Sequence, residues 1–145
     1  MIYFLDTSAL VKCYIEEPGS DKIQICISQA KVVAVSQLAY PETLSALVRR
    51  RQSLQNYSDD QFTLLVKSFR RDWKHFTVLG INDETLHHID RLIEVHHLRG
   101  ADSIHLSTAL SFRSVTKTPV IFVASDIGLL SAARKERLMI LDPTV

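Results

Sequence analysis

The chain has few of the residues that cross-link or interrupt a polypeptide. Its 145 residues include two cysteines, four glycines and four prolines. Cys13 and Cys26 lie inside predicted helices and form no CxxC pair, which indicates two buried thiols in a reducing compartment. The sequence shows no internal repeat, linker or low-complexity segment.

Long apolar runs and a strong charge of one sign are absent as well. No apolar run exceeds five residues, and no basic segment precedes the first one. We therefore expect no membrane-spanning helix and no secretory signal, and the sequence favours a cytoplasmic protein. The net charge of +1 disfavours a protein that coats nucleic acid by bulk charge. Any polyanionic partner must meet a local basic patch.

The residues that are present suffice for one hydrophobic core. With 46% hydrophobic residues, the chain is expected to form a single domain over residues 1–145. Two fully apolar runs, 2–5 and 120–124, are typical of buried parallel strands. Shorter runs at 32–35, 77–79 and 138–141 alternate with helical stretches. This alternation predicts an α/β protein with a doubly wound parallel sheet.

Residues typical of helix ends locate the predicted helices in the first half of the chain. Apolar spacing predicts a helix over 8–17 and a second one capped by Ser20 and Asp21. The third helix begins at Pro41, where a missing N–H costs little, unless Ser36 caps it earlier and Pro41 distorts its first turns.

Two later helices have clearer start signals. Ser58 and Gln61 form a capping box, and the apolar face over residues 62–76 indicates core packing rather than a platform for stacking bases. Asn82 or Asp83 starts the next helix, whose apolar face is predicted at Leu86, Ile89 and Ile93. After Gly100 a further helix begins at Ala101.

Four acidic residues are expected at one edge of the sheet. Asp6 follows the first strand, and Ser125-Asp126 follows the second apolar run, so both lie at carboxyl ends of parallel strands, outside which ligands bind. Glu42 lies at the head of a helix. Asp102 lies in the first turn of another, where the helix dipole favours an ionised carboxylate.

Four carboxylates in one crevice repel one another, and a divalent cation would neutralise them. Hard oxygen ligands select Mg²⁺ or Mn²⁺ over Zn²⁺, and Mg²⁺ commonly binds through carboxylates and substrate phosphate. Phosphoryl chemistry is therefore the favoured class. The histidine pairs 87–88 and 96–97 lack the one-turn spacing of a zinc site.

The chain resembles PIN-domain nucleases of the VapC toxin type almost end to end. The matching motifs are Leu5-Asp6-Thr7-Ser8-Ala9-Leu10, Tyr40-Pro41-Glu42, the segment Leu98 to Leu106, and Ser125-Asp126. The resemblance implies a three-layer α/β/α sandwich and a metal-dependent endoribonuclease that uses Mg²⁺, with Mn²⁺ able to substitute. It assigns the catalytic and metal-binding roles to Asp6, Glu42, Asp102 and Asp126. It also implies a homodimer, and a protein antitoxin whose C-terminal segment covers the groove.

Polar and basic residues near the acids have two interpretations each. Ser8 and Ser125 can hydrogen-bond ligand carboxylates or phosphate, although helix capping explains Ser8 equally well. Arg49, Arg50 and Arg51 end the third helix and can contact RNA phosphates, or they form a solvated helix end.

Other functions remain as alternatives. A phosphoaspartate signalling domain shares the α/β alternation, but usually has paired acids where this chain has only Asp6. A dehalogenase-like phosphatase would need an Asp at the position of Ser8. A PIN nuclease or RNA-binding protein outside a toxin–antitoxin system is also compatible. Metal-dependent cleavage of RNA, as opposed to dephosphorylation of a small phosphoester, would distinguish these classes.

Overall fold

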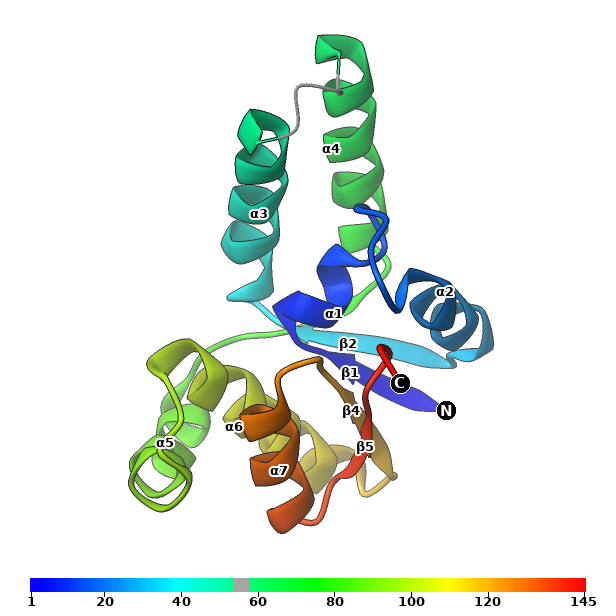
Figure 1. Ribbon diagram of the computed structural model, residues 1–145. Coiled ribbons are helices and arrows are strands. Elements are labelled where there is room, and N and C mark those ends of the chain that lie inside the picture. The colour runs from blue at the N-terminus through cyan, green and yellow to red at the C-terminus, as the bar shows by residue number, and fades with distance from the viewer. Residues whose placement is uncertain (54–57) are drawn as a thin grey trace.

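The described strands form one parallel sheet in the order β3-β2-β1-β4-β5 (Figure 1). The computed structural model describes residues 1–53 and 58–145. The strands are β1 (Ile2–Leu5), β2 (Val32–Ser36), β3 (Thr77–Leu79), β4 (Val120–Val123) and β5 (Met139–Leu141). The two fully apolar runs form β1 and β4, and every residue of both strands is buried. This is expected of central strands in a parallel sheet that is covered on both faces.

The strand order reverses at β1, the central strand. Ile2 pairs with Val32 on one side and with Val120 on the other. The chain builds β2 and β3 outward from one side of β1, and β4 and β5 outward from the other. In such sheets the crevice for ligands opens beyond the carboxyl ends of the strands at this reversal. Asp6 and Ser125-Asp126 follow the two strands that meet there.

Helices cover both faces of the sheet (Figure 1). They are α1 (Thr7–Val11), α2 (Ser20–Gln29), α3 (Ala39–Ser53), α4 (Asp59–Trp73), α5 (Asp83–His96), α6 (Gly100–Thr116) and α7 (Ile127–Lys135). Ile2 and Phe4 belong to the core that includes residues of α5, α6 and α7, whereas Tyr3 and Leu5 pack with residues of α1 to α4. Successive strand residues alternate between the faces. The predicted three-layer α/β/α sandwich is confirmed.

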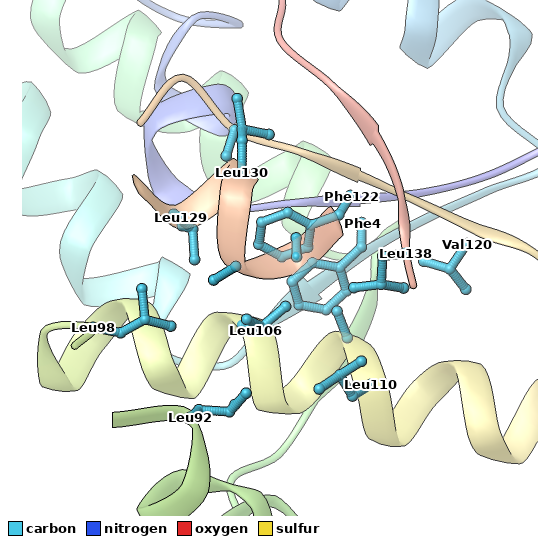
Figure 2. Packing of buried hydrophobic residues seen from close by; sticks show 14 of the residues in the cluster. Phe4, Leu92, Leu98, Leu106, Leu110, Val120, Phe122, Leu129, Leu130 and Leu138 are labelled. Atoms are coloured by element: carbon cyan, nitrogen blue, oxygen red, sulfur yellow. The ribbon is translucent and has the colours of Figure 1, made fainter. Parts of the chain in front are cut away.

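Phe4 and Phe122 form the centre of the core that the sheet shares with α5, α6 and α7 (Figure 2). Their rings stack with centroids 5.7 Å apart, and Leu106 and Leu110 of α6 pack beneath them. On the opposite face, aromatic side chains join α4 to the rest of the chain. Phe69 packs against Tyr14 and Tyr40 at 5.4 and 5.3 Å, and Trp73 lies 5.1 Å from Tyr40. The aromatic face of α4 is therefore core, as predicted.

The start signals of two helices are confirmed in detail. Ser58 and Gln61 make both hydrogen bonds of a capping box, and Asn82 forms a second such box with Thr85. Helix α3 begins at Ala39, between the two predicted starts. Pro41 lies in its first turn, where no intrahelical N–H is required, and the Ser36 hydroxyl accepts the Leu38 N–H at 3.2 Å.

The first helix is shorter than predicted. Helix α1 ends at Val11 rather than Glu17, because the next residues bond three positions back, as Tyr14 N–H does to Val11 O at 3.0 Å. Cys13 consequently lies in a turn and is only partly buried, while Cys26 is buried in α2, and both thiols are free.

The predicted cap of α2 was wrong. Gly19, with φ of 98°, occupies the N-cap, so Ser20 is already helical. The Ser20 hydroxyl instead donates to Ile15 O at 3.1 Å.

The predicted apolar face of α5 was also wrong in part. Leu86 and Ile93 are 55% and 37% exposed, whereas Thr85 and Leu92 are buried. The capping box and the Ser107 hydroxyl, which donates to Thr85 O, turn the Thr85 side of α5 toward α6. Small differences in bounds occur at Gly100, Val123 and Met139. None of the described helices is both long and apolar enough to cross a bilayer.

Candidate active site

Asp6 is buried at the junction of β1 and α1. Its Oδ1 accepts the Ser8 hydroxyl at 2.7 Å and the Ala9 N–H at 2.9 Å, and it is the N-cap of α1. The residue is 4% exposed. Burial raises the pKa of Asp6 to about 6, against the effect of these hydrogen bonds, and the charge of Asp102 adds to the rise.

Glu42 in the first turn of α3 is held by two donors from other helices. Its Oε1 accepts the Thr7 hydroxyl at 2.7 Å and lies 2.7 Å from His105 Nε2. Thr7 Oγ1 is 3.2 Å from the same nitrogen. The three side chains therefore link α1, α3 and α6. The hydrogen bond from His105 is the main cause that lowers the pKa of Glu42. The hydrogen bond from Thr7 and the charge of Arg49 contribute, against the opposing effect of burial.

Asp102 and Asp126 complete the group of acids. Burial raises the pKa of Asp102, which lies in the first turn of α6, and the charge of Asp126 raises it further. Asp126 is the N-cap of α7 and accepts the Leu129 N–H at 2.8 Å. The structure thus brings all four predicted acids to one edge of the sheet, near enough for Asp102 to feel the charges of Glu42 and Asp126.

Ser8 connects the two strand ends that carry acids. Its hydroxyl donates to Asp6 and accepts the Ser125 N–H at 3.2 Å. The predicted contact between Ser8 and a carboxylate is therefore present, whereas helix capping is performed by Asp6 itself. The Ser125 hydroxyl is buried without a hydrogen-bond partner among the described residues, so its contribution here comes from the backbone.

The three arginines of α3 have different surroundings. Arg49 is exposed, two helical turns from Glu42 on the same helix face, and its charge lowers the pKa of Glu42 after the larger effects of His105 and Thr7. Arg51 pairs with Asp59 and lies 4.7 Å above the ring of Phe62. Of these two, Arg49 is thus the one whose charge reaches the acids, while Arg51 fastens α3 to α4.

Two site residues were not predicted from the sequence, although both stand within the motifs. Thr7 directly follows Asp6. His105 follows Asp102 by three residues, a spacing that places both on one side of α6. That spacing was an available signal, because a buried polar residue beside an acid on one helix face indicates a shared site.

The four carboxyl groups are the type of ligand that a hard cation prefers, but they do not surround a single point. Within residues 1–53 and 58–145, no three His, Cys, Asp or Glu side chains are arranged to hold a metal ion. Asp6, Glu42 and Asp126 are each turned to a neighbouring donor. Carboxylate oxygens that repel one another are nevertheless the type of ligand that Mg²⁺ or Mn²⁺ prefers.

A pocket of about 460 Å³ lies elsewhere. Val32 and Thr77, the first residues of β2 and β3, line it together with Tyr14 and Asp72, whose hydroxyl and carboxylate are 2.9 Å apart. None of the four acids lines this pocket. We therefore assign the candidate site from the acids and their contacts.

Comparison with known proteins identifies the family of this chain. The family model for the PIN domain matches residues 3–135. The chain belongs to the PIN domain family. This PIN domain is 31% identical over 115 residues to ribonuclease VapC45 of Mycobacterium tuberculosis, and the match covers 77% of this chain and 76% of that protein.

Solved structures share the fold of this PIN domain at low sequence identity. FitAcB from Neisseria gonorrhoeae superposes with a TM-score of 0.72 at 14% identity, covering 99% of this chain and 98% of that one. A toxin–antitoxin complex from Klebsiella pneumoniae gives a TM-score of 0.66 at 14% identity, with 97% of each chain covered.

Proposed function

We propose that this PIN domain is a Mg²⁺- or Mn²⁺-dependent endoribonuclease. The observation that carries the proposal is the meeting of Asp6, Glu42, Asp102 and Asp126 at the reversal of strand order, with Asp6 buried there at an elevated pKa. Such a site attracts a divalent cation and, through it, a phosphodiester. The relative named as a ribonuclease supports RNA as the substrate.

In the proposed mechanism the carboxylates hold the cation and place water. Asp6 would be the main residue to hold the cation, and Glu42 and Asp102 would hold it directly or through water. Asp126, the most exposed of the four, orients the attacking water or holds a second ion. A cation held there would supply Lewis acidity for the hydrolysis of a phosphodiester.

Three features of the chain serve the reaction besides the acids. Ser8 fixes the Asp6 carboxylate, and Thr7 does the same for Glu42. Arg49 supplies positive charge beside a site that would otherwise repel a polyanion. Fixed groups of this kind lower the cost of reorganisation during the reaction.

The decisive experiment compares cleavage of RNA by the wild type and by Asp6→Asn in Mn²⁺. Asn retains an oxygen for Ser8 and Ala9 but lacks the charge that the cation needs, so cleavage should be abolished. Asp90→Asn, an exposed acid on α5, is the control and should cleave normally. Wild-type activity of folded Asp6→Asn would refute the assignment. Cleavage of a small phosphomonoester instead of RNA would favour a phosphatase.

We also propose that the protein is the toxin of a toxin–antitoxin pair, acts in the cytoplasm and forms a homodimer. The support is the fold shared with the Klebsiella pneumoniae toxin–antitoxin complex and the relative named VapC45. Expression of the chain alone should then arrest growth, and Asp6→Asn should relieve the arrest. The molar mass in solution, measured by light scattering, tests whether the protein is a homodimer. Harmless expression of an active nuclease would point to a PIN nuclease outside such pairs.

A further inference from the structure

The contact between Glu42 and His105 has a distinctive geometry. Both donors, Thr7 Oγ1 and His105 Nε2, meet the same carboxylate oxygen, Oε1, at 2.7 Å. Neither of them engages Oε2. Because a carboxylate only accepts hydrogen bonds, Nε2 must carry the hydrogen in this contact. Glu42 is thereby restrained at one oxygen, although its side chain is 33% exposed.

Apart from its contacts with Glu42 and Thr7, the His105 ring makes no side-chain hydrogen bond within the described residues. The residue is 2% exposed, and its Nδ1 is buried without a partner there. Buried polar atoms normally find partners, and each that does not costs stability. An imidazole kept purely for packing could be replaced by an apolar side chain without this cost. The polar side of the ring therefore serves Glu42 and Thr7.

We propose that His105 is a positioning residue for the metal site. It acts through Glu42, whose Oε1 it holds so that Oε2 remains available to the cation. This inference rests on the proposed function, because it concerns the same metal site. Residues that orient a metal ligand by hydrogen bonding typically change metal affinity by about 10- to 100-fold when they are replaced.

A matched pair elsewhere in the protein separates this role from simple stability. His96 Nε2 lies 2.9 Å from Glu136 Oε2, and the His96 side chain is 5% exposed. Glu136 follows α7 at the end away from Asp126. Replacing His96 therefore removes a similar contact of a buried histidine with a glutamate, without touching the acids of the site.

The experiment measures binding of Mn²⁺ by calorimetry, together with melting of the metal-free protein. His105→Phe should weaken Mn²⁺ binding by about 10- to 100-fold, whereas His96→Phe should leave it unchanged. Two further variants give a rescue test. In His105→Gln the amide NH₂ reaches roughly the place of Nε2 and should restore most of the affinity. In His105→Asn it lies nearer the place of Nδ1 and should not.

A double variant tests whether His105 acts through Glu42. With Glu42→Ala already present, His105→Phe should cause no further loss of Mn²⁺ affinity. Wild-type affinity in His105→Phe, an equal loss in His96→Phe, or a full additional loss in the double variant would overturn this inference while leaving the proposed function in place. A wild type that binds no Mn²⁺ would overturn both. If His105→Phe does not fold, the comparison of His105→Gln with His105→Asn decides.

Discussion

Asp6 is an ionisable side chain whose charge the fold disfavours without a cation. Its pKa is raised from 3.8 to about 6 in the folded protein. Well below pH 3.8 the carboxyl group is protonated in both the folded and the unfolded state. As the pH rises through 6 the folded state acquires a buried charge, so the contribution of Asp6 to stability is lost.

Asp6→Asn should therefore stabilise the metal-free protein, mainly at the higher pH. We expect the free energy of unfolding to rise by roughly 1–3 kcal/mol at pH 8 and by much less at pH 4. Urea unfolding in the presence of a chelator at both pH values measures the difference. A loss of stability at pH 8 would mean that Asp6 is a structural acid whose hydrogen bonds outweigh its desolvation.

Arg49 and Arg51 differ in the partners that the fold gives them. If Arg49 contacts an RNA phosphate, Arg49→Ala should weaken binding of RNA and reduce the slope of log affinity against log salt by about 1. Arg51→Ala should leave that slope unchanged and lower the melting temperature slightly, because Arg51 is occupied by Asp59 and Phe62. Filter binding in the Asp6→Asn background, in which RNA should not be cleaved, provides the measurement.

The control for the arginines is Lys135→Ala, in the last turn of α7 and far along that helix from Asp126. If the slope of log affinity against log salt is the same for Arg49→Ala and Lys135→Ala, Arg49 makes no specific contact with RNA and belongs to a solvated helix end.

Single residues could be predicted from the sequence where their position in a strand or helix decides their place. Asp6 and Asp126 could be found because each comes after an apolar strand. The contacts of Thr7 and His105 with Glu42 could not be predicted, since they depend on how α1, α3 and α6 meet. The contact of Ser8 with a carboxylate was predicted, but its hydrogen bond with the Ser125 N–H, which joins the ends of β1 and β4, was not.

The junction before α2 depends on a glycine that no other residue replaces without strain. Gly19 has φ of 98°, and an added Cβ would lie 2.9 Å from the Pro143 backbone. Gly19→Ala should destabilise the protein by about 2 kcal/mol or more, because both the left-handed conformation and the contact oppose it. Chemical denaturation measures the change.

Gly100→Ala is the matched substitution for this test. Gly100 opens α6, and an added Cβ would meet no heavy atom within 4 Å. We expect a neutral effect or a gain of about 0.4–1 kcal/mol. A neutral result for Gly19→Ala would show that the α2 junction and the C-terminal segment adapt to each other.

At the scale of elements, local signals predicted the strands and the two helices with capping boxes correctly. The apolar runs of β1 and β4 and the capping box at Ser58 needed no knowledge of neighbours. The end of α1 and the inward face of α5, in contrast, could be predicted only with knowledge of the neighbouring elements. Helix α5 turns Thr85 rather than Leu86 inward because its capping box and its contact with α6 override the apolar pattern.

At the scale of the whole molecule, the proposed cation site formed by Asp6, Glu42, Asp102 and Asp126 should couple cation binding to folding. A cation that binds only the folded state should raise the free energy of unfolding by about 2.7 kcal/mol at a concentration of 100 times its Kd. Melting with and without Mn²⁺ measures this rise, which Asp6→Asn should largely remove. An unchanged midpoint at saturating Mn²⁺ would contradict a carboxylate metal site.

The central strand obtains its two neighbours from distant parts of the sequence. During synthesis β1 emerges first, whereas β4 and Asp126 emerge only after α6. A domain of this kind folds as a unit. A nascent chain therefore lacks two of the four acids, Asp102 and Asp126, until most of the chain has left the ribosome. The proposed nuclease activity should therefore be absent from a chain that is still attached to the ribosome and should appear only after release.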